Sequence, residues 1–269
     1  MRSAALLLIV ALCAGCATSP TGRSQLMLVS PEQAVVASRQ AYLTQIGELE
    51  KKGKLASDRQ LLEWVEDVTS RLVAQAVIMR PDTKAWEWSV AVIDDPEVVN
   101  AWCMAGGRMA IYTGLIRKID PTEDELAQVM AHEIAHALAN HTAEKMSIAM
   151  ASQAGILAAA VISDRPGAAV AGAALAAQLA VELPNSRTAE TEADRIGIEL
   201  AARAGFDPNA AVTLWQKMGR VGGKSPPQFL STHPAPQTRE QTLRELAPKL
   251  TPVYRSATNP PRHPVRIVS

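Results

Sequence analysis

Apolar residues recur with helical spacing over most of the chain. Ser30-Pro31-Glu32-Gln33 matches an N-cap, a proline at the first helical position and a capping-box glutamine, and it predicts a helix to about Glu50. A second helix is predicted from Ser57, because apolar residues follow at spacings of four, three and four. Cap and break signals predict further helices over residues 122–141, 146–162, 168–183, 186–204, 207–219 and 236–246.

Strand patterns are few and short. Residues 86–93 alternate between apolar and small or polar side chains, which predicts a half-buried strand. Residues 100–104 and 108–112 are two further candidates, joined by Gly106-Gly107, which supplies the positive φ angles of a tight hairpin. The pattern therefore predicts an α+β fold that is mostly helical with a small sheet.

The N-terminus has the pattern of a secretory signal. Arg2 precedes a short apolar run, and Cys13-Ala14-Gly15 precedes Cys16. Small residues before a cysteine resemble a bacterial lipoprotein signal, although Cys13 stands where that signal usually has an aliphatic residue. The resemblance implies diacylation of Cys16, and Ala17 favours the outer membrane. An ordinary secretory signal is the alternative.

These signals divide the chain into four parts. We expect a signal peptide over residues 1–15, a tether over 16–29, a single domain over 30–250 and a loose proline-rich tail over 251–269. Two Ala-rich segments, 146–162 and 168–183, are each shorter than the roughly 20 residues of a membrane-spanning helix. We interpret them as buried helices, with a pair dipping into the membrane surface as the alternative.

Composition excludes several classes of function. Lys and Arg number 27, as do Asp and Glu, so no excess positive charge is present to hold a nucleic acid. Three cysteines do not make a disulfide framework, and only Cys103 would remain free after removal of the signal and lipidation of Cys16. Attachment to a membrane would then depend on acyl chains and not on electrostatics.

The chemistry centres on His132-Glu133-Ile134-Ala135-His136. Four residues of helix turn about 400°, so both imidazoles project from one face and can bind one ion. Zinc accepts neutral imidazole nitrogens, and Glu133 lies close enough to act on a metal-bound water. Two core histidines bonded to neighbours are the alternative.

The third ligand must come from elsewhere in the chain. A metzincin would need glycine at 139 and histidine at 142, where this chain has Ala139 and Thr142. His141 would lie half a turn from His132, so we expect it to be a solvated or hydrogen-bonded histidine. Glu190 is the better candidate, and it shares a helix face with Asp194, so one carboxylate can bind metal while the other accepts an imidazole N–H. We expect Glu192 to face solvent.

Together the motifs resemble the gluzincin family that includes HtpX-type membrane proteases, CAAX prenyl proteases and BepA-type proteases. The resemblance extends from the His132 motif to Ser186–Gly197, Val99-Asn100-Ala101 and Ser231-Thr232-His233-Pro234 with Arg239. It implies a zincin-like metalloprotease domain with a small antiparallel sheet beside the motif helix. It also implies one zinc ion held by His132, His136 and Glu190, with Glu133 as general base and Asp194 orienting a ligand.

Three further roles follow from the resemblance and stay open. In BepA-type members the histidine of the His-Pro motif, here His233, can occupy the fourth zinc position and hold the enzyme off; otherwise His233 or Arg239 stabilises the oxyanion or braces the loop. Asn100 and Ala101 resemble a strand that pairs with an extended substrate, and plain strand structure is the alternative. Cys103 departs from the family pattern, and we expect it to be a buried small apolar residue.

The sequence thus predicts a zinc endopeptidase, lipid-anchored on the periplasmic side of the outer membrane, that acts in envelope protein quality control. Its partners would be protein or peptide substrates, such as misfolded envelope proteins, and the membrane, but no nucleic acid. The alternative is a chaperone or assembly factor for outer-membrane proteins with a latent or structural zinc site. A third class, a surface-binding lipoprotein, would bind no metal.

Overall fold

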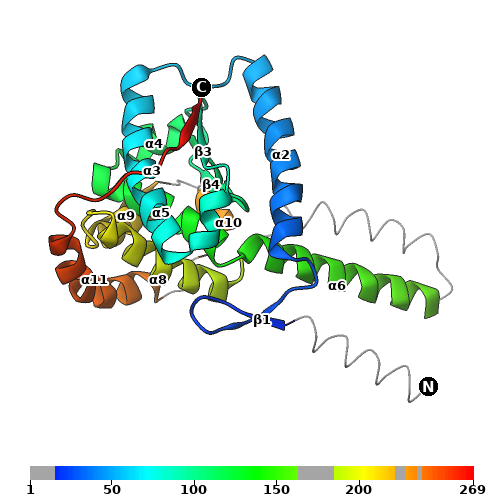
Figure 1. Ribbon diagram of the computed structural model, residues 1–269. Helices are drawn as coiled ribbons and strands as arrows, with labels where there is room; N and C mark the ends of the chain where they lie inside the picture. The colour runs from blue at the N-terminus through cyan, green and yellow to red at the C-terminus, as the bar shows by residue number, and fades with distance from the viewer. Residues whose placement is uncertain (1–15, 163–184, 222–227, 235–237) are drawn as a thin grey trace. The chain divides into compact units, whose positions relative to one another are not determined.

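The computed structural model describes residues 16–162, 185–221, 228–234 and 238–269 (Figure 1). The chain forms two compact units: Met1–Ala34 with Asn140–Leu183, and Val35–Ala139 with Pro184–Ser269. The predicted signal peptide and the second Ala-rich segment, 168–183, lie outside the described residues.

The second unit contains a sheet in the order β4-β5-β3-β6. Strands β4 (Ala101–Met104) and β5 (Arg108–Tyr112) form the predicted antiparallel hairpin, with φ of 88° at Gly106 and 79° at Gly107. The sheet is mixed and not purely antiparallel, because β5 inserts between β4 and β3 (Ser89–Ile93) and runs parallel to β3. The last strand, β6 (Arg266–Val268), is also parallel to β3.

Strand β3 is buried on both faces, so the expectation of a half-buried strand was wrong. Val90 and Val92 face the main core, where helix α3 (Arg59–Met79) also packs. Ala91 faces the other way, into a second cluster that contains Tyr42 of helix α2 (Pro31–Lys51). A strand flanked by two strands and covered on both faces needs no solvent-facing side.

Helix α5 (Glu123–Leu138) lies at the centre of this unit. It begins as predicted with a capping box, because the Thr122 side chain accepts from Glu125 N and the Glu125 side chain accepts from Thr122 N. It ends earlier than predicted, since Asn140 has φ of 55° and the next helix starts at His141. It packs against β4, α3, α8 (Arg187–Arg203) and α9 (Ala210–Arg220) (Figure 1). Helix α11 (Arg239–Ser256) packs in turn against α8 and α9.

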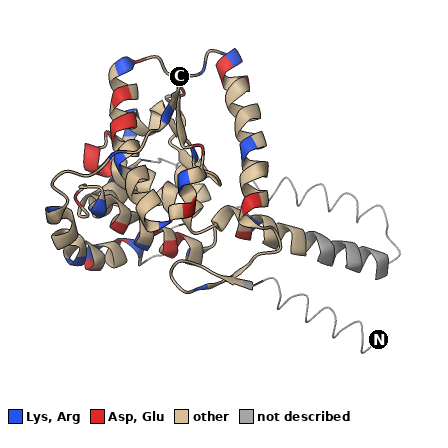
Figure 2. Cartoon of the chain, viewed as in Figure 1, with Lys and Arg blue, Asp and Glu red and all other residues tan. Residues whose placement is uncertain are grey.

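Other boundaries differ for local reasons. Helix α3 begins after Asp58, whose side chain accepts from Gln60 N and Leu61 N, and not after Ser57. A short 3-10 helix (Pro81–Ala85) follows α3, and α4 (Thr113–Ile119) and α10 (Gln228–Thr232) were not predicted. Lys and Arg are interspersed with Asp and Glu along the helices (Figure 2), as in the i,i+4 pair of Glu199 and Arg203 on α8.

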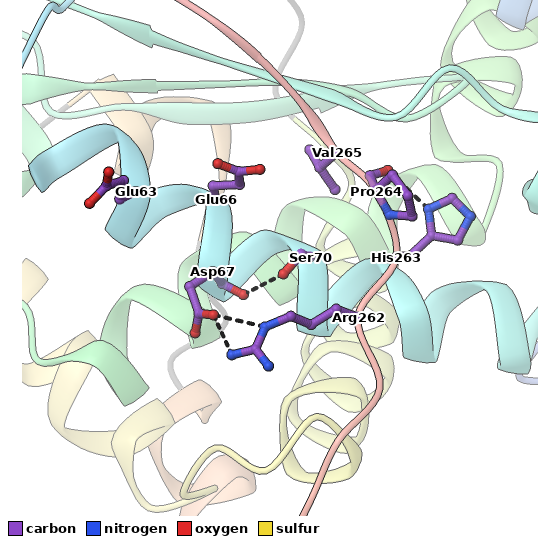
Figure 3. A pocket seen from close by; sticks show the side chains of 8 residues that line it. All are labelled: Glu63, Glu66, Asp67, Ser70, Arg262, His263, Pro264 and Val265. Atoms are coloured by element: carbon purple, nitrogen blue, oxygen red, sulfur yellow. Dashed lines mark hydrogen bonds and ion pairs between the residues drawn. The ribbon is translucent and has the colours of Figure 1, made fainter. Parts of the chain in front are cut away.

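The C-terminal residues are part of the fold and not a loose tail. Helix α11 continues through Pro248 and Pro252 to Ser256, and β6 pairs with β3. Between them, Arg262 Nε donates to Asp67 Oδ1 on α3 over 2.9 Å (Figure 3). His263 N donates to Ser70 O over 3.0 Å. A surface pocket of about 470 Å³ lies between α3 and this segment.

The first unit contains a hairpin and a helix. Strands β1 (Cys16–Thr18) and β2 (Ser24–Leu26) pair in antiparallel fashion, so the expected tether is ordered here. Helix α6 (His141–Ile162) holds the hairpin through Glu144, which pairs with Arg23 at 2.6 Å and accepts from Gln25 at 3.0 Å. Within the described residues, every helix is too short or too polar to cross a bilayer.

Candidate metal centre

Helix α5 presents two imidazoles to one buried point. His132 and His136 are 4% and 5% exposed, and their Nε2 atoms lie 3.1 Å apart. The one-turn spacing predicted from the sequence produces this arrangement directly.

Helix α8 brings a carboxylate to the same point. Glu190 is fully buried; its Oε2 lies 3.3 Å from His132 Nε2, and its Oε1 lies 3.3 Å from His136 Nε2. Ser186 caps the helix by accepting from Ala189 N, which fixes where α8 begins. The two helices approach closely at Gly197, where a Cβ would stand 3.0 Å from His132 Cα.

A third imidazole enters from the end of α10. His233 Nδ1 lies 3.1 Å from Glu190 Oε1 and 3.3 Å from His132 Nε2, while its Nε2 lies 3.4 Å from Glu133 Oε1. Phe229 stacks on its ring with centroids 4.5 Å apart. Phe229 N in turn donates to Val99 O, so a residue two positions before β4 helps to place His233.

These donors form a group suited to a metal ion. One ligand atom from each of His132, His136, Glu190 and His233 lies within 4.8 Å of all the others, and all four residues are buried. Glu133 Oε1 and Glu190 Oε2 are buried without a hydrogen-bond partner among the described residues. Buried polar atoms of this kind are costly unless something satisfies them, and a cation among imidazole and carboxylate donors would do so.

Asp194 aligns the first imidazole. Its Oδ1 lies 3.1 Å from His132 Nδ1, which directs Nε2 toward the group. Burial opposes protonation of His132, but the carboxylates of Asp194 and Glu190 outweigh burial and the nearby Arg239, and they raise the pKa of His132 to about 9. Burial also opposes ionisation of Glu190, yet its contacts with three imidazoles hold its pKa well below the usual range.

The pKa of Glu133 is shifted upward, in contrast to that of Glu190. Glu133 is 2% exposed, and burial raises its pKa even though His233 and His132 favour its ionised form. A buried carboxylate with a raised pKa suits a general base near neutral pH. Cys103 is buried as expected, and its pKa is raised by burial and by the negative charge of Glu133.

Arg239 lies beside both carboxylates of α8. Its Nη2 donates to Asp194 Oδ1 over 2.5 Å, and its Nη1 lies 3.4 Å from Glu190 Oε2. Its guanidinium carbon stands 3.4 Å from the ring centroid of Trp215 on α9. No sequence pattern pointed to Trp215, because nothing local indicates which residue of α9 faces α11.

Other sequence-based expectations had mixed outcomes. Glu192 is 4% exposed, so the expectation that it faces solvent was wrong; α8 is covered there by its neighbours. His141 begins α6 and is not among the grouped donors. Asn100 lies just before β4, the edge strand of the described sheet, and its side-chain oxygen accepts from Ala101 N over 3.0 Å. Asn185, which sequence reasoning missed, places Nδ2 3.3 Å from His233 Nδ1.

Comparison with known families fits this geometry. Residues 59–247, which include all four grouped donors, match the model of peptidase family M48. The chain belongs to peptidase family M48. The predicted resemblance to zinc metallopeptidases with a His-Glu-x-x-His motif is therefore confirmed.

Individual M48-type relatives come from distant organisms. The mitochondrial metalloendopeptidase OMA1 of Schizosaccharomyces pombe is 37% identical over 188 residues, covering 69% of this chain and 53% of that protein. The putative beta-barrel assembly-enhancing protease of Vibrio cholerae is 35% identical over 207 residues, covering 73% and 41%. The OMA1 protein of Arabidopsis thaliana is 36% identical over 160 residues, covering 59% and 31%. The chain spans about half or less of the length of these relatives.

Proposed function

We propose that this M48 protein is a zinc-dependent endopeptidase. The observation that carries the proposal is the meeting of His132, His136 and Glu190 around one buried point, with Glu133 beside it. Two imidazoles and one carboxylate are a set of protein ligands that catalytic zinc sites use. Bound there, zinc would supply a Lewis acid that polarises a peptide carbonyl and lowers the pKa of water.

Each residue then has one task. His132, His136 and Glu190 hold the ion, and Asp194 keeps His132 in the tautomer whose Nε2 is free to bind. Glu133 takes a proton from the attacking water and returns it to the leaving amine. The raised pKa of Glu133 supports this role, because a base with an ordinary glutamate pKa would bind the proton too weakly near neutral pH.

The substrate would lie along β4. In the β4–β5 register, Tyr112 N donates to Asn100 O, so the backbone groups of Ala101 and Cys103 point to the edge that no other described strand covers. Of these groups, Ala101 N donates to Asn100 Oδ1. We propose that an extended peptide pairs with this edge by strand addition, with Asn100 and Ala101 at the contact. Because β4 packs against α5, the peptide would pass close to Glu133.

Two variants test the activity. Glu133→Gln should abolish hydrolysis of an unstructured protein such as casein and still bind one zinc ion. Glu190→Ala should lose both the metal and the activity. Glu199→Gln is the matched control and should keep both, because Glu199 is a partly exposed glutamate on α8, the helix that carries Glu190. Full activity of Glu133→Gln would refute the mechanism, and full zinc content of Glu190→Ala would refute the assigned ligand set.

We propose further that the protein is lipid-anchored through Cys16 at the periplasmic face of the outer membrane, where it degrades misfolded envelope proteins. Support comes from the small-residue sequence before Cys16 and from the names of the beta-barrel assembly-enhancing proteases of Vibrio cholerae and Escherichia coli. The OMA1 relatives are named as mitochondrial, so the compartment rests on the N-terminal signal.

A second candidate function has one observation in its favour. A catalytic zinc keeps an open position, whereas His233 makes the donor group four-membered. A chaperone or assembly factor for outer-membrane proteins with a latent zinc site would have this arrangement. It predicts that Glu133→Gln supports envelope assembly as well as the wild type does, whereas a protease predicts accumulation of uncleaved envelope proteins.

A further inference from the structure

The positive charge of Arg239 is needed to balance the negative charges of the carboxylates buried at the metal centre. Glu133, Glu190 and Asp194 are each at most 6% exposed, so three carboxylates share one interior region. A divalent cation would offset two negative charges, and the guanidinium of Arg239 offsets the third. Because buried charges are tolerated only when paired, the position of Arg239 matters for the whole group.

The guanidinium is nevertheless held by few hydrogen bonds. Arg239 is 3% exposed, and Nη2 alone makes its hydrogen bonds: a short one to Asp194 Oδ1, and longer ones to Nδ1 and Nε2 of His132 at 3.2 and 3.3 Å. Its Nε and Nη1 are buried without a hydrogen-bond partner among the described residues. A guanidinium normally depends on several of its five donors to fix its plane, so something else must set the orientation here.

The indole of Trp215 provides that second constraint. Arg239 Cζ lies 3.4 Å from the ring centroid, which is face-on stacking of a planar cation. The same indole meets the His132 ring edge-on with centroids 6.0 Å apart and lies 5.7 Å from the Phe229 ring. One side chain of α9 thus contacts the arginine, a ligand of the metal group and the ring on which His233 stacks.

We propose that Trp215 is a positioning residue for the metal centre, acting through Arg239. The stacked indole holds the guanidinium in the plane from which Nη2 reaches Asp194, and Asp194 then holds His132 by its Nδ1 with Nε2 directed at the metal. One chain of contacts thus runs from Trp215 on α9 through Arg239 and Asp194 to His132, which would bind the ion. The inference rests on the metal centre of the proposed function.

The chain of contacts makes a directional prediction. Loss of an outer partner of a metal-binding histidine weakens metal binding about 10-fold to 100-fold. Trp215→Leu should therefore weaken zinc binding about tenfold, whereas Trp215→Phe, which keeps an aromatic face, should stay within about threefold. If Arg239 acted only as a positive charge that repels the ion, loosening it would leave zinc binding unchanged or make it tighter.

The experiment measures the zinc dissociation constant of the full purified chain by competition with a chromophoric chelator. Trp86→Leu is the matched control, because Trp86 is also partly buried and carries an arginine, Arg80, 5.3 Å from its ring centroid, but has no contact with the grouped donors. It should bind zinc as the wild type does. Circular dichroism of the metal-free variants checks that each is folded.

A double-mutant cycle tests the route through Arg239. Arg239→Lys keeps the charge but not the plane, so it should weaken zinc binding, and Trp215→Leu should add little to it. If Trp215→Leu alone folds poorly, Trp215→Met replaces it in the cycle, because methionine also removes the aromatic face and has a volume similar to that of leucine. Unchanged or tighter binding in Trp215→Leu, or full additivity with Arg239→Lys, would overturn the inference. A wild-type chain that binds no zinc would instead overturn the proposed function.

Discussion

The backbone of Gly197 on α8 lies directly against the backbone of His132 on α5. A Cβ at position 197 would stand 3.0 Å from both Cα and N of His132 and 3.2 Å from the carbonyl carbon of Ala131. These neighbours belong to the interior of a helix and cannot rotate away as a side chain would. The close approach brings Glu190, two turns earlier on α8, within reach of both imidazoles of α5.

Gly197→Ala should therefore separate the two helices. We expect a loss of about 1–3 kcal/mol in the free energy of unfolding, as for other overpacked interiors, together with weaker zinc binding. Urea unfolding of the metal-free chain and a chelator competition measure the two effects.

Gly47→Ala is the matched control for this substitution. Gly47 lies within α2 and a Cβ there would meet nothing within 4 Å, so alanine should stabilise the chain by about 0.5–1 kcal/mol through helix propensity. Equal effects of the two substitutions would show that the contact between Gly197 and His132 does not limit the helix spacing.

The sequence was sufficient to predict features that depend only on residues a few positions apart in the chain. The helical period places His132 and His136 on one face, and the same period places Glu190 and Asp194 together. The capping box at Thr122 likewise depends on residues three apart. Such features need no knowledge of the partner element, so they could be predicted.

What could not be predicted depends on contacts between distant segments. The burial of both faces of β3 requires that α2 cover one of them. The three-residue strand β6 is stabilised by pairing with residues 177 positions earlier in the chain. Trp215 is similar, since its contacts at the site are with residues of other elements: Arg239, His132 and Phe229. Neither a short apolar strand nor a single aromatic residue has a local sequence pattern that indicates such a distant partner.

Metal binding should release a proton from His132. Although burial opposes its protonation, Asp194 and Glu190 raise the pKa of His132 to about 9, so the metal-free imidazole is charged at neutral pH. Zinc binds only the neutral ring, so protons compete with zinc below that pKa and not above it. The apparent affinity should rise up to about tenfold per pH unit from about pH 7 to 9 and then level off.

Calorimetry of zinc binding in two buffers of different ionisation enthalpy counts the released protons. Asp194→Asn removes one of the carboxylates that raise the pKa of His132, so the pH dependence should become shallower in this variant. A zinc affinity that is constant over the same pH range would contradict the protonated state of His132.

His233 should hold the centre closed. Its Nδ1 lies among the donor atoms of Glu190 and His132, and its Nε2 lies 3.4 Å from Glu133 Oε1, so the ring occupies space that water and substrate would need. We expect His233→Ala to raise the rate of hydrolysis of an unstructured peptide severalfold while zinc remains bound by the other three ligands.

His263→Ala is the control, because His263 lies on the C-terminal segment, with its Nδ1 3.0 Å from the neighbouring Pro264 O, and is not one of the grouped donors. It should leave hydrolysis unchanged. A fall in activity of His233→Ala with zinc retained would instead assign His233 to the reaction itself, for example to stabilising the oxyanion.

Membrane attachment should depend on Cys16 and resist salt. The chain carries as many acidic as basic residues, so electrostatic attraction to a lipid surface is weak, whereas two or more acyl chains anchor a protein stably. Washing membranes with concentrated salt should therefore leave the wild type in the pellet, and Cys16→Ser should appear in the soluble fraction. Cys103→Ala controls for the loss of a cysteine, since Cys103 is buried and should not affect fractionation. Release of the wild type by salt alone would show that charge, and not lipid, holds the protein at the membrane.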